Sequence, residues 1–308
     1  MSAPLLSRPP VGRVAQGGAA AGAPGGGLSA PTGAGKSTPP PRSARTLPIE
    51  GREFPALVSL LAPLAGLAAV GLLWWVGGQV LRANPNFVAF TGFAPAEALA
   101  SFWRLITSGD ALRAALPSLG RVLGGLGIAF LIGAPVGLIF GSVRLVEKAL
   151  QLPFQILRMV SPLSWMPIAV LAFPSWDGAI IFLIAIAAVW PIIFATAAGV
   201  KRIDPAWLSV GRTLGGKGVA LMREIIIPAI LPDILVGLRL ALGVAWIVLV
   251  PSEYLGVTSG LGYAINDARD TLSYDRLAAL VLLIGLIGWA LDSLLGLIAA
   301  RVRWTHAN

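Results

Sequence analysis

Six long apolar segments restrict the possible folds of this 308-residue chain more than any other feature of the sequence. They are Pro55–Leu81, Leu116–Gly141, Ile156–Phe173, Ala179–Val200, Ile234–Tyr254 and Leu277–Ala300. Each is close to the ~20 residues that an α-helix needs to cross a hydrocarbon core of ~30 Å. Only 12% of the residues are charged, which is about half the share in a soluble domain. The sequence therefore predicts an all-α, polytopic membrane protein with six transmembrane helices.

The third segment, Ile156–Phe173, is short and contains Pro162 and Pro167. Proline removes a backbone N–H group and clashes with the preceding turn of a helix. Such breaks are tolerated in a membrane where neighbouring protein or a water-filled cavity satisfies the freed carbonyl groups. We therefore expect this segment to be interrupted at its prolines.

The positions of Lys and Arg predict the orientation of the chain. Residues 1–52 are rich in Gly, Ala, Pro and Ser and carry six basic residues, so we expect a disordered, basic, cytoplasmic tail. With this tail inside the cell, the inner tails and loops hold 15 Lys and Arg and the outer loops hold five. Short cytoplasmic loops carry an excess of Lys and Arg, so both termini, including residues 303–308, are predicted to be cytoplasmic.

The tail contains APTGAGKST at positions 30–38, which is similar to a phosphate-binding P-loop. The P-loop pattern G-x-x-x-x-G-K-[ST] requires a first glycine at position 30, where the chain has Ala30. No apolar strand precedes the motif, and the prolines of the following PPPR cannot open a phosphate-binding helix. We predict that the tail binds no nucleotide.

Composition excludes several other classes of site. The chain has no Cys, and its single histidine is His306, near the end of the sequence. We therefore expect no metal site, no cofactor and no catalytic residue, since H-E-x-x-H and G-x-S-x-G motifs are also missing from the sequence. The net charge of +9 does not indicate nucleic acid, because the basic residues lie at the edges of apolar segments.

Two loops are longer than a simple connection requires. Residues 82–115, on the predicted outer side, read as amphipathic helices on the periplasmic surface. In the predicted cytoplasmic loop 201–233, Asp204 and Pro205 form a strong helix start. The helix would carry the apolar residues Trp207, Leu208, Val210 and Leu214 and end at Gly215 and Gly216. A second helical run would extend from Val219 to Ile227 and end at Pro228. The loop helix could rest on the inner leaflet or fill a groove of a cytoplasmic partner.

This loop resembles the signature of type I ABC-transporter permeases, E-A-A, three residues, Gly, nine residues, I-x-L-P. Gly215, Ile225, Ile227 and Pro228 fit its second half, although Ile227 replaces leucine. Ser209, Val210 and Gly211 stand where E-A-A would be. The stretches SLGRVLGGLGIAF, SPLSWMPIAVLAF, LPDILVGLRLALGVAWIVLVPSEYLG and SGLGYAINDARD resemble the nitrate/sulfonate/taurine branch of this family.

The resemblance covers about residues 113–302 and implies a permease domain there, after a region 53–112 with the first transmembrane helix and a periplasmic amphipathic part. It implies a subunit of the bacterial inner membrane that pairs with a second permease copy in a homodimer. Cytoplasmic ATPase subunits would dock on the coupling loop, and a periplasmic binding protein would deliver a small anion such as nitrate, a sulfonate or taurine. The expected coupling residues are Pro205, Trp207, Leu208, Leu214, Gly215, Ile225 and Pro228.

The broken third segment is expected to line the translocation path through Ser161, Ser164, Trp165 and Pro167, although Trp165 could be only a packing residue. An ion-coupled secondary transporter and an intramembrane enzyme are alternatives. The first would usually show inverted repeats and carboxylates near the bilayer midplane, and the second lacks candidate catalytic residues.

Four charges fall inside the apolar segments. Arg239 and Asp292 lie at similar depths from the cytoplasmic ends of the fifth and sixth segments, and Arg121 and Glu253 lie near the outer face. Each pair is predicted to form an ion pair, because a partner reduces the cost of a charge in the membrane. The alternative is that Arg121 or Arg239 attracts an anionic substrate.

Overall fold

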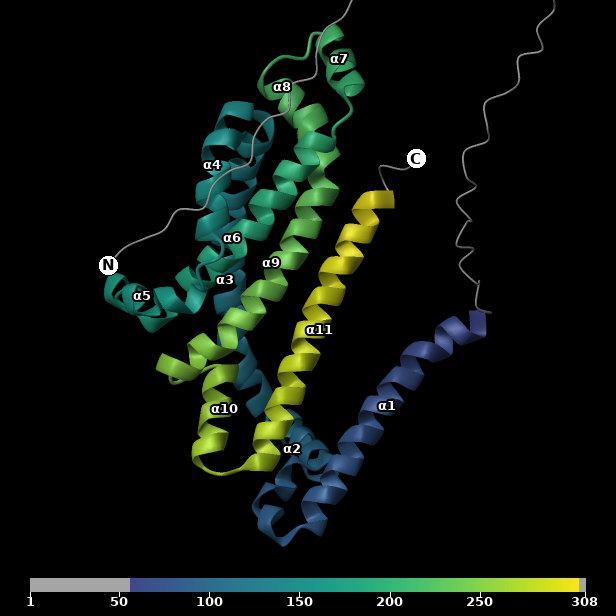
Figure 1. Cartoon of the computed structure of the whole chain (residues 1–308), viewed down its shortest axis with the longest axis vertical. Coiled ribbons are helices and arrows are strands. Elements are labelled where there is room, and N and C mark those ends of the chain that lie inside the picture. The colour runs from purple at the N-terminus through teal and green to yellow at the C-terminus, as the bar shows by residue number, and fades with distance from the viewer. Residues whose placement is uncertain (1–55, 305–308) are drawn as a thin grey trace, which may run out of the picture. The chain divides into compact units, whose positions relative to one another are not determined.

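The computed structural model describes residues 56–304, with side chains over 61–302. Every regular element in this range is helical (Figure 1). The first elements are α1 (Ala56–Ala83), η1 (Pro85–Phe93), α2 (Pro95–Thr107), α3 (Asp110–Ser142), α4 (Arg144–Leu157), η2 (Pro162–Trp165) and α5 (Met166–Ala172). They are followed by α6 (Trp176–Arg202), α7 (Pro205–Thr213), α8 (Val219–Leu221), η3 (Met222–Ile226), α9 (Ile227–Gly256), α10 (Leu261–Asp270) and α11 (Tyr274–Trp304). The predicted all-α class is confirmed.

Five helices are long and apolar enough to span a membrane: α1, α3, α6, α11 and the continuous run from α8 through α9. A sixth span is reached only if α4 and the η2–α5 segment count as one bent span. The four helices α3, α6, α9 and α11 begin before the predicted apolar segments and end after them. Asp110, Asp177 and Asp275 lie in the first turns of α3, α6 and α11, whereas α9 begins earlier through the mainly apolar residues 227–233.

The prediction that the third segment spans as 156–173 is wrong in its boundaries. Its first helix begins at Arg144, and the chain bends by 84° between α4 and η2–α5. The break precedes Pro162: Ser161 has extended backbone with ψ of 128°, as expected for a residue before proline. The interruption at Pro162 is confirmed, whereas Pro167 lies within the first turn of α5 and does not interrupt it.

The core is built from α3, α6 and α9, which lie side by side (Figure 1). Small residues allow α3 and α6 to approach closely. A Cβ on Gly137 of α3 would lie 2.6 Å from the carbonyl oxygen of Ile193 in α6. Close backbone approach through small residues is typical of helix packing in membranes. These three helices therefore form the rigid frame on which the remaining elements are placed.

One end of the bundle is formed by η1, α2, α10 and the start of α11, and we call it the α10 end. The predicted amphipathic helix is present as α2, which buries Ala98, Ser101 and Leu105. α1 joins this end through a hydrogen bond of 2.9 Å from the Trp74 indole N–H to the Phe93 carbonyl. The span α1 is otherwise largely exposed in the single chain.

The opposite end, which we call the α7 end, carries α7 and α8. The prediction that the second loop helix stops at Pro228 is wrong, because α8, the π-helical turn η3 and α9 form one continuous run. Pro228 lies in the first turn of α9, directly after η3. A π-helical turn changes the backbone hydrogen-bond register, and here the N–H of Ile227 donates to the Met222 carbonyl. This change accommodates a proline that would otherwise interrupt the helix.

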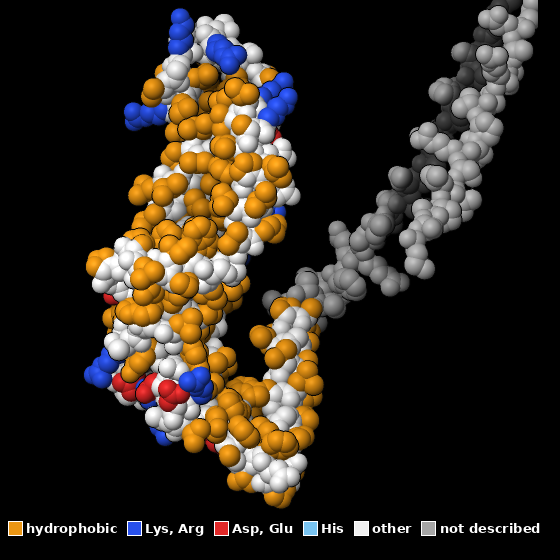
Figure 2. Space-filling model, turned by 60° about the vertical axis from the view of Figure 1, so that its left-hand side comes forward, with side chains coloured by type: hydrophobic (Ala, Val, Ile, Leu, Met, Phe, Trp, Pro, Cys, Tyr) orange, Lys and Arg blue, Asp and Glu red, His pale blue; other side chains and the backbone are white. Residues whose placement is uncertain are grey.

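Side-chain types follow the expected pattern of a membrane protein (Figure 2). Lys and Arg side chains gather at the α7 end, acidic and basic side chains mix towards the α10 end, and apolar side chains cover most of the surface between them. The predicted tail with its P-loop-like motif and His306 lie outside the described residues. Of the predicted C-terminal tail 303–308, the first two residues belong to α11.

Candidate translocation face and coupling segment

Helix α7 begins at the predicted signal. The Asp204 side chain accepts a hydrogen bond of 2.8 Å from the Ala206 N–H group, and Pro205 occupies the first helical position. An N-cap carboxylate satisfies one of the N–H groups that a helix leaves free at its start. The start of this helix is therefore fixed by three consecutive residues and needs no tertiary contact.

The end of α7 is a Schellman motif. The N–H of Gly215 donates to the Arg212 carbonyl at 3.0 Å, and the N–H of Gly216 donates to the Gly211 carbonyl at 2.9 Å. Gly215 has φ of +88°, and no neighbouring atom lies within 4 Å of a Cβ built there. The positive φ, and not a close approach of another element, therefore explains the glycine at this position.

The apolar residues of α7 differ in exposure. Leu208 is half-buried, and a Cβ on Gly211 would overlap the Ile225 side chain. In contrast, Trp207 and Val210 are each 59% exposed, and Leu214, at the end of the helix, is 82% exposed. Trp207 and Val210 border a pocket together with the half-buried Ile225 and Pro228, which belong to the run that continues into α9. The helix is thus attached to this run and presents exposed apolar side chains.

The broken segment borders a hollow of about 810 Å³. Its walls come from the α4–η2 region, α6 and α9, and include Pro162, Trp165, Trp190 and Phe194. Of the predicted path residues, only Trp165 lines this hollow; Ser161, Ser164 and Pro167 are exposed but are not among its lining residues. The hollow also contains Arg158, which had no role in the sequence interpretation.

A second hollow of about 910 Å³ lies between α9 and α11. Arg239 and Asp292 line it and form the predicted ion pair, with 2.6 Å between Arg239 Nε and Asp292 Oδ1. Their side chains are 50% and 44% exposed in the single chain. Leu240 and Val244 line both hollows. We call the surface of α9 that joins them, with Val236, Leu240, Gly243, Val244 and Ile247, the α9 face.

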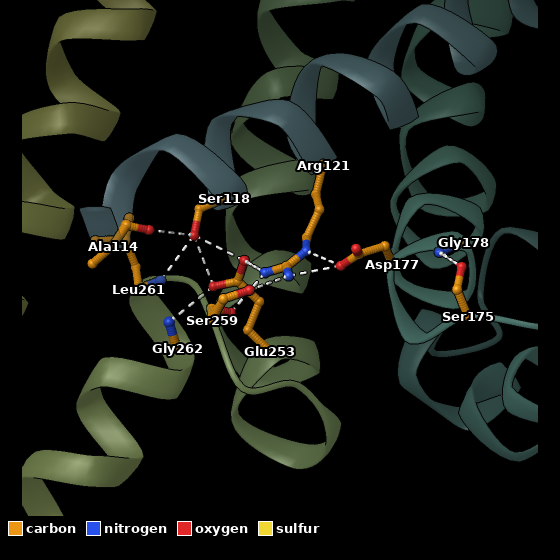
Figure 3. Close-up of polar contacts among 10 residues, drawn as sticks. All are labelled: Ala114, Ser118, Arg121, Ser175, Asp177, Gly178, Glu253, Ser259, Leu261 and Gly262. Carbon is orange, nitrogen blue, oxygen red and sulfur yellow. Dashed lines mark hydrogen bonds and ion pairs between the residues drawn. The ribbon is translucent and has the colours of Figure 1, made fainter. Parts of the chain in front are cut away.

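The second predicted pair has the opposite environment. Arg121 on α3 and Glu253 on α9 are in contact, with side chains 5% and 0% exposed (Figure 3). Arg121 also contacts Asp177 at the start of α6, with 2.8 Å between its Nε and Asp177 Oδ1. The cluster therefore joins the three core helices. Both predicted pairs are present, and Arg121 and Arg239 each have a carboxylate partner.

A short loop before α10 completes this buried cluster (Figure 3). Arg121 donates from Nη1 to the Ser259 carbonyl and from Nη2 to the Ser259 hydroxyl, each at 2.9 Å. The Gly262 N–H donates to the Glu253 carboxylate at 2.9 Å. Gly260 has φ of +110°, and a Cβ there would lie 2.5 Å from the Glu253 carboxyl carbon. The loop thus supplies backbone partners for both charges.

Three members of the cluster were missed in the sequence: Ser118, Asp177 and Ser259. Ser118 donates to Glu253 at 2.8 Å and accepts from the Leu261 N–H at 2.8 Å. Its position three residues before Arg121 on one helix face was a usable signal. Asp177 and Ser259 gave none, because each lies at the edge of an apolar segment and is brought in by tertiary packing.

Within residues 56–304 no group of three or more His, Cys, Asp or Glu side chains could hold a metal ion. The candidate functional features of the described chain are the α7 helix, the two hollows and the buried cluster.

Residues 129–304 match the family model for the binding-protein-dependent transport system inner membrane component. The chain is 38% identical over 185 residues to the nitrate import permease protein NrtB of Leptolyngbya laminosa, covering 60% of this chain and 66% of that protein. It is 33% identical over 268 residues to the bicarbonate transport system permease protein CmpB of Synechococcus elongatus, covering 82% of this chain and 91% of that protein.

A nitrate import permease protein NrtB of Synechococcus elongatus is 35% identical over 190 residues, which is 61% of this chain and 68% of that protein. The predicted family and branch are confirmed, because the matched region contains α6, α7 and α9 and the relatives include nitrate and bicarbonate permeases. The chain therefore belongs to the binding-protein-dependent transport system inner membrane components and is a non-catalytic, multi-pass permease subunit of the type I ABC-transporter family.

Proposed function

We propose that this permease imports a small anion, driven by ATP that separate ATPase subunits hydrolyse on the cytoplasmic side. The observation that carries the proposal is helix α7, which has an apolar exposed face and is packed on the run that continues into α9. A partner that displaces α7 would therefore also displace α9. The α7 end is assigned to the cytoplasm, because Lys and Arg are concentrated in the loops and tails on that side.

The α9 face is the proposed wall of the translocation path. Arg239 on α9 and Asp292 on α11 are half-exposed beside it, at a depth where charges do not normally face lipid. We propose that a second copy of the permease faces this surface, so that the two α9 helices enclose a polar path. Trp165 belongs to the same wall through the hollow that reaches Leu240 and Val244.

Substrate is proposed to enter at the α10 end, delivered by a periplasmic binding protein. The relatives named for nitrate and bicarbonate support a small monovalent anion as cargo. ATP-driven closure of the ATPase dimer would favour one of two conformations of the α9 face, and only a difference in affinity between the two states can drive such a change.

The experiment is uptake of radiolabelled nitrate or bicarbonate by proteoliposomes that contain the permease, its ATPase and its binding protein. We expect uptake that requires ATP and the binding protein. Uptake driven by an ion gradient without ATP would contradict the proposal and indicate a secondary transporter instead.

The docking role of α7 is tested by Trp207→Ala, Leu214→Ala and Gly215→Glu, with Leu145→Ala as control. Leu145 is also an exposed leucine, 77% accessible, but lies on α4. A few residues usually dominate an interface, so we expect copurification of the ATPase to fall about tenfold in the first three variants and to be unchanged in the control. Wild-type copurification and transport in all of them would show that α7 is only a structural turn.

A further inference from the structure

Arg158 stands at the point where α4 ends and the broken segment begins. Its guanidinium carbon lies 5.2 Å from the centre of the Phe194 ring, and it lines the 810 Å³ hollow. Among the described side chains that line this hollow, Arg158 is the only charged one; Trp165, Trp190 and Phe194 form aromatic walls around it. The hollow therefore combines one cation with apolar surroundings.

No carboxylate of the described chain forms an ion pair with Arg158. The two other arginines inside apolar segments are neutralised, Arg121 by Glu253 and Arg239 by Asp292. The remaining described cations without an ion pair are in segments assigned to the cytoplasmic side: Arg144, Lys148, Arg212, Lys217, Arg223 and Arg301. Phe194 lies eight residues before the end of α6, so Arg158 lies at a depth of about 12 Å from that end, and its side chain is exposed in the single chain.

We propose that Arg158 is a binding site for a planar, monovalent oxyanion that crosses the permease. The guanidinium is planar and can donate two parallel hydrogen bonds to such an anion. The cation–π contact with Phe194 holds one face of the group and leaves its N–H edge free. The apolar walls strengthen the attraction, while the presence of a single cation keeps binding weak enough for release.

This proposal deepens the proposed function, since it names the residue that selects the charge of the cargo. It differs from the alternative in which Arg121 or Arg239 attracts the anion: each of those groups already has a carboxylate partner that would have to leave first. Arg158 requires no such exchange.

Anion binding is measured on the assembled transporter by quenching of tryptophan fluorescence. Iodide is an anionic quencher and acrylamide a neutral one. The Trp165→Phe/Trp190→Phe double variant identifies the part of the fluorescence that comes from the two tryptophans of the hollow. We expect Arg158→Gln to reduce iodide quenching of that signal at least about threefold, with quenching by acrylamide unchanged. Nitrate should compete with iodide in the wild-type protein and in Arg158→Lys. Arg144→Gln, which removes an unpaired cation at the other end of α4, is the control.

Uptake gives the second measurement. We expect Arg158→Gln to raise the apparent KM for the anion about tenfold, as for loss of one charged hydrogen-bond partner, while ATP hydrolysis stimulated by the loaded binding protein persists. Unchanged iodide quenching in Arg158→Gln would overturn the proposal. Loss of acrylamide quenching in both Arg158→Gln and Arg158→Lys would also overturn it, because it would show that Arg158 is a packing residue. Failure of ATP-dependent uptake in the wild-type protein would contradict the importer function. The quenching measurement does not depend on uptake and would still decide whether Arg158 binds an anion.

Discussion

The two intramembrane ion pairs of this permease have the same chemistry and opposite surroundings. Arg121 and Glu253 are buried where α3, α6 and α9 meet, and they also bond to Ser118, Asp177, Ser259 and a backbone N–H group. Among the described residues, Arg239 and Asp292 bond only to each other, and they lie half-exposed beside a 910 Å³ hollow.

The difference indicates different roles. A buried pair with all its partners in place holds elements together, because removing one member leaves an unpaired charge in a low-dielectric interior. An exposed pair has little effect on the stability of a single chain, and the value of Arg239 and Asp292 must come from what lies against the α9 face. We therefore propose that the first pair is structural and that the second belongs to the proposed assembly.

The largest expected effect is the loss of one member of the buried pair. Arg121→Leu or Glu253→Leu should lower the free energy of unfolding by about 3–5 kcal/mol, measured by denaturation in detergent. The double variant Arg121→Leu/Glu253→Leu should recover part of the loss, since no buried charge then remains unpaired and the Asp177 carboxylate, which loses its partner, is 63% exposed. Losses that simply add would show that the two residues do not act as a pair.

The loop that covers the pair provides the next test. Gly260→Ala should destabilise the chain by about 2 kcal/mol or more. Its φ of +110° and ψ of 174° lie in a region essentially restricted to glycine, which costs other residues about 1–3 kcal/mol, and a Cβ would overlap the Glu253 carboxyl group. Gly109→Ala is the control for positive φ without overlap: Gly109 has φ of +78° in the left-handed helical region, and a Cβ there meets no atom within 4 Å. Equal losses in both variants would mean that the loop does not press on Glu253.

For the exposed pair we expect a smaller effect that depends on assembly. Arg239→Leu and Asp292→Leu should change the thermal midpoint of the single chain much less than Arg121→Leu does. In the assembled transporter each should lower stability or assembly more clearly, and the double variant should recover part of that loss. Stability unchanged in both states, with uptake abolished in Arg239→Leu alone, would instead assign Arg239 to the substrate.

The smallest effect concerns the rim of the buried cluster. Asp177 bonds to Arg121 at 2.8 Å, but its side chain is 63% exposed. Asp177→Asn should therefore cost less than about 1 kcal/mol, as for other exposed ion pairs. A loss as large as that of Glu253→Leu would mean that Arg121 depends equally on both carboxylates, and the distinction between its buried and exposed partners would fail.

The features that the sequence predicted well depend on interactions between residues that are close together in the chain. The caps of α7 require only Asp204 and Pro205 at one end and Gly215 at the other, because N-cap bonds and positive φ are local properties. The break at Pro162 is similarly local. The extent of α3 was underestimated, since this helix continues through Asp110 and Arg113. The extent of α9 was underestimated and the stop at Pro228 was wrong, because a π-helical turn accommodates that proline.

By itself, the sequence determined that the chain is a helical membrane protein of this family, because apolar length and short motifs do not depend on how the helices meet. Only the tertiary structure decided what each charge contacts. Arg121 and Glu253 are 132 positions apart, and Arg158 differs from Arg121 and Arg239, the other two arginines within apolar segments, in having no ion pair with a described carboxylate. Such differences arise when helices distant in sequence pack together, since the partners of a charge are set by the spatial neighbours that this packing creates.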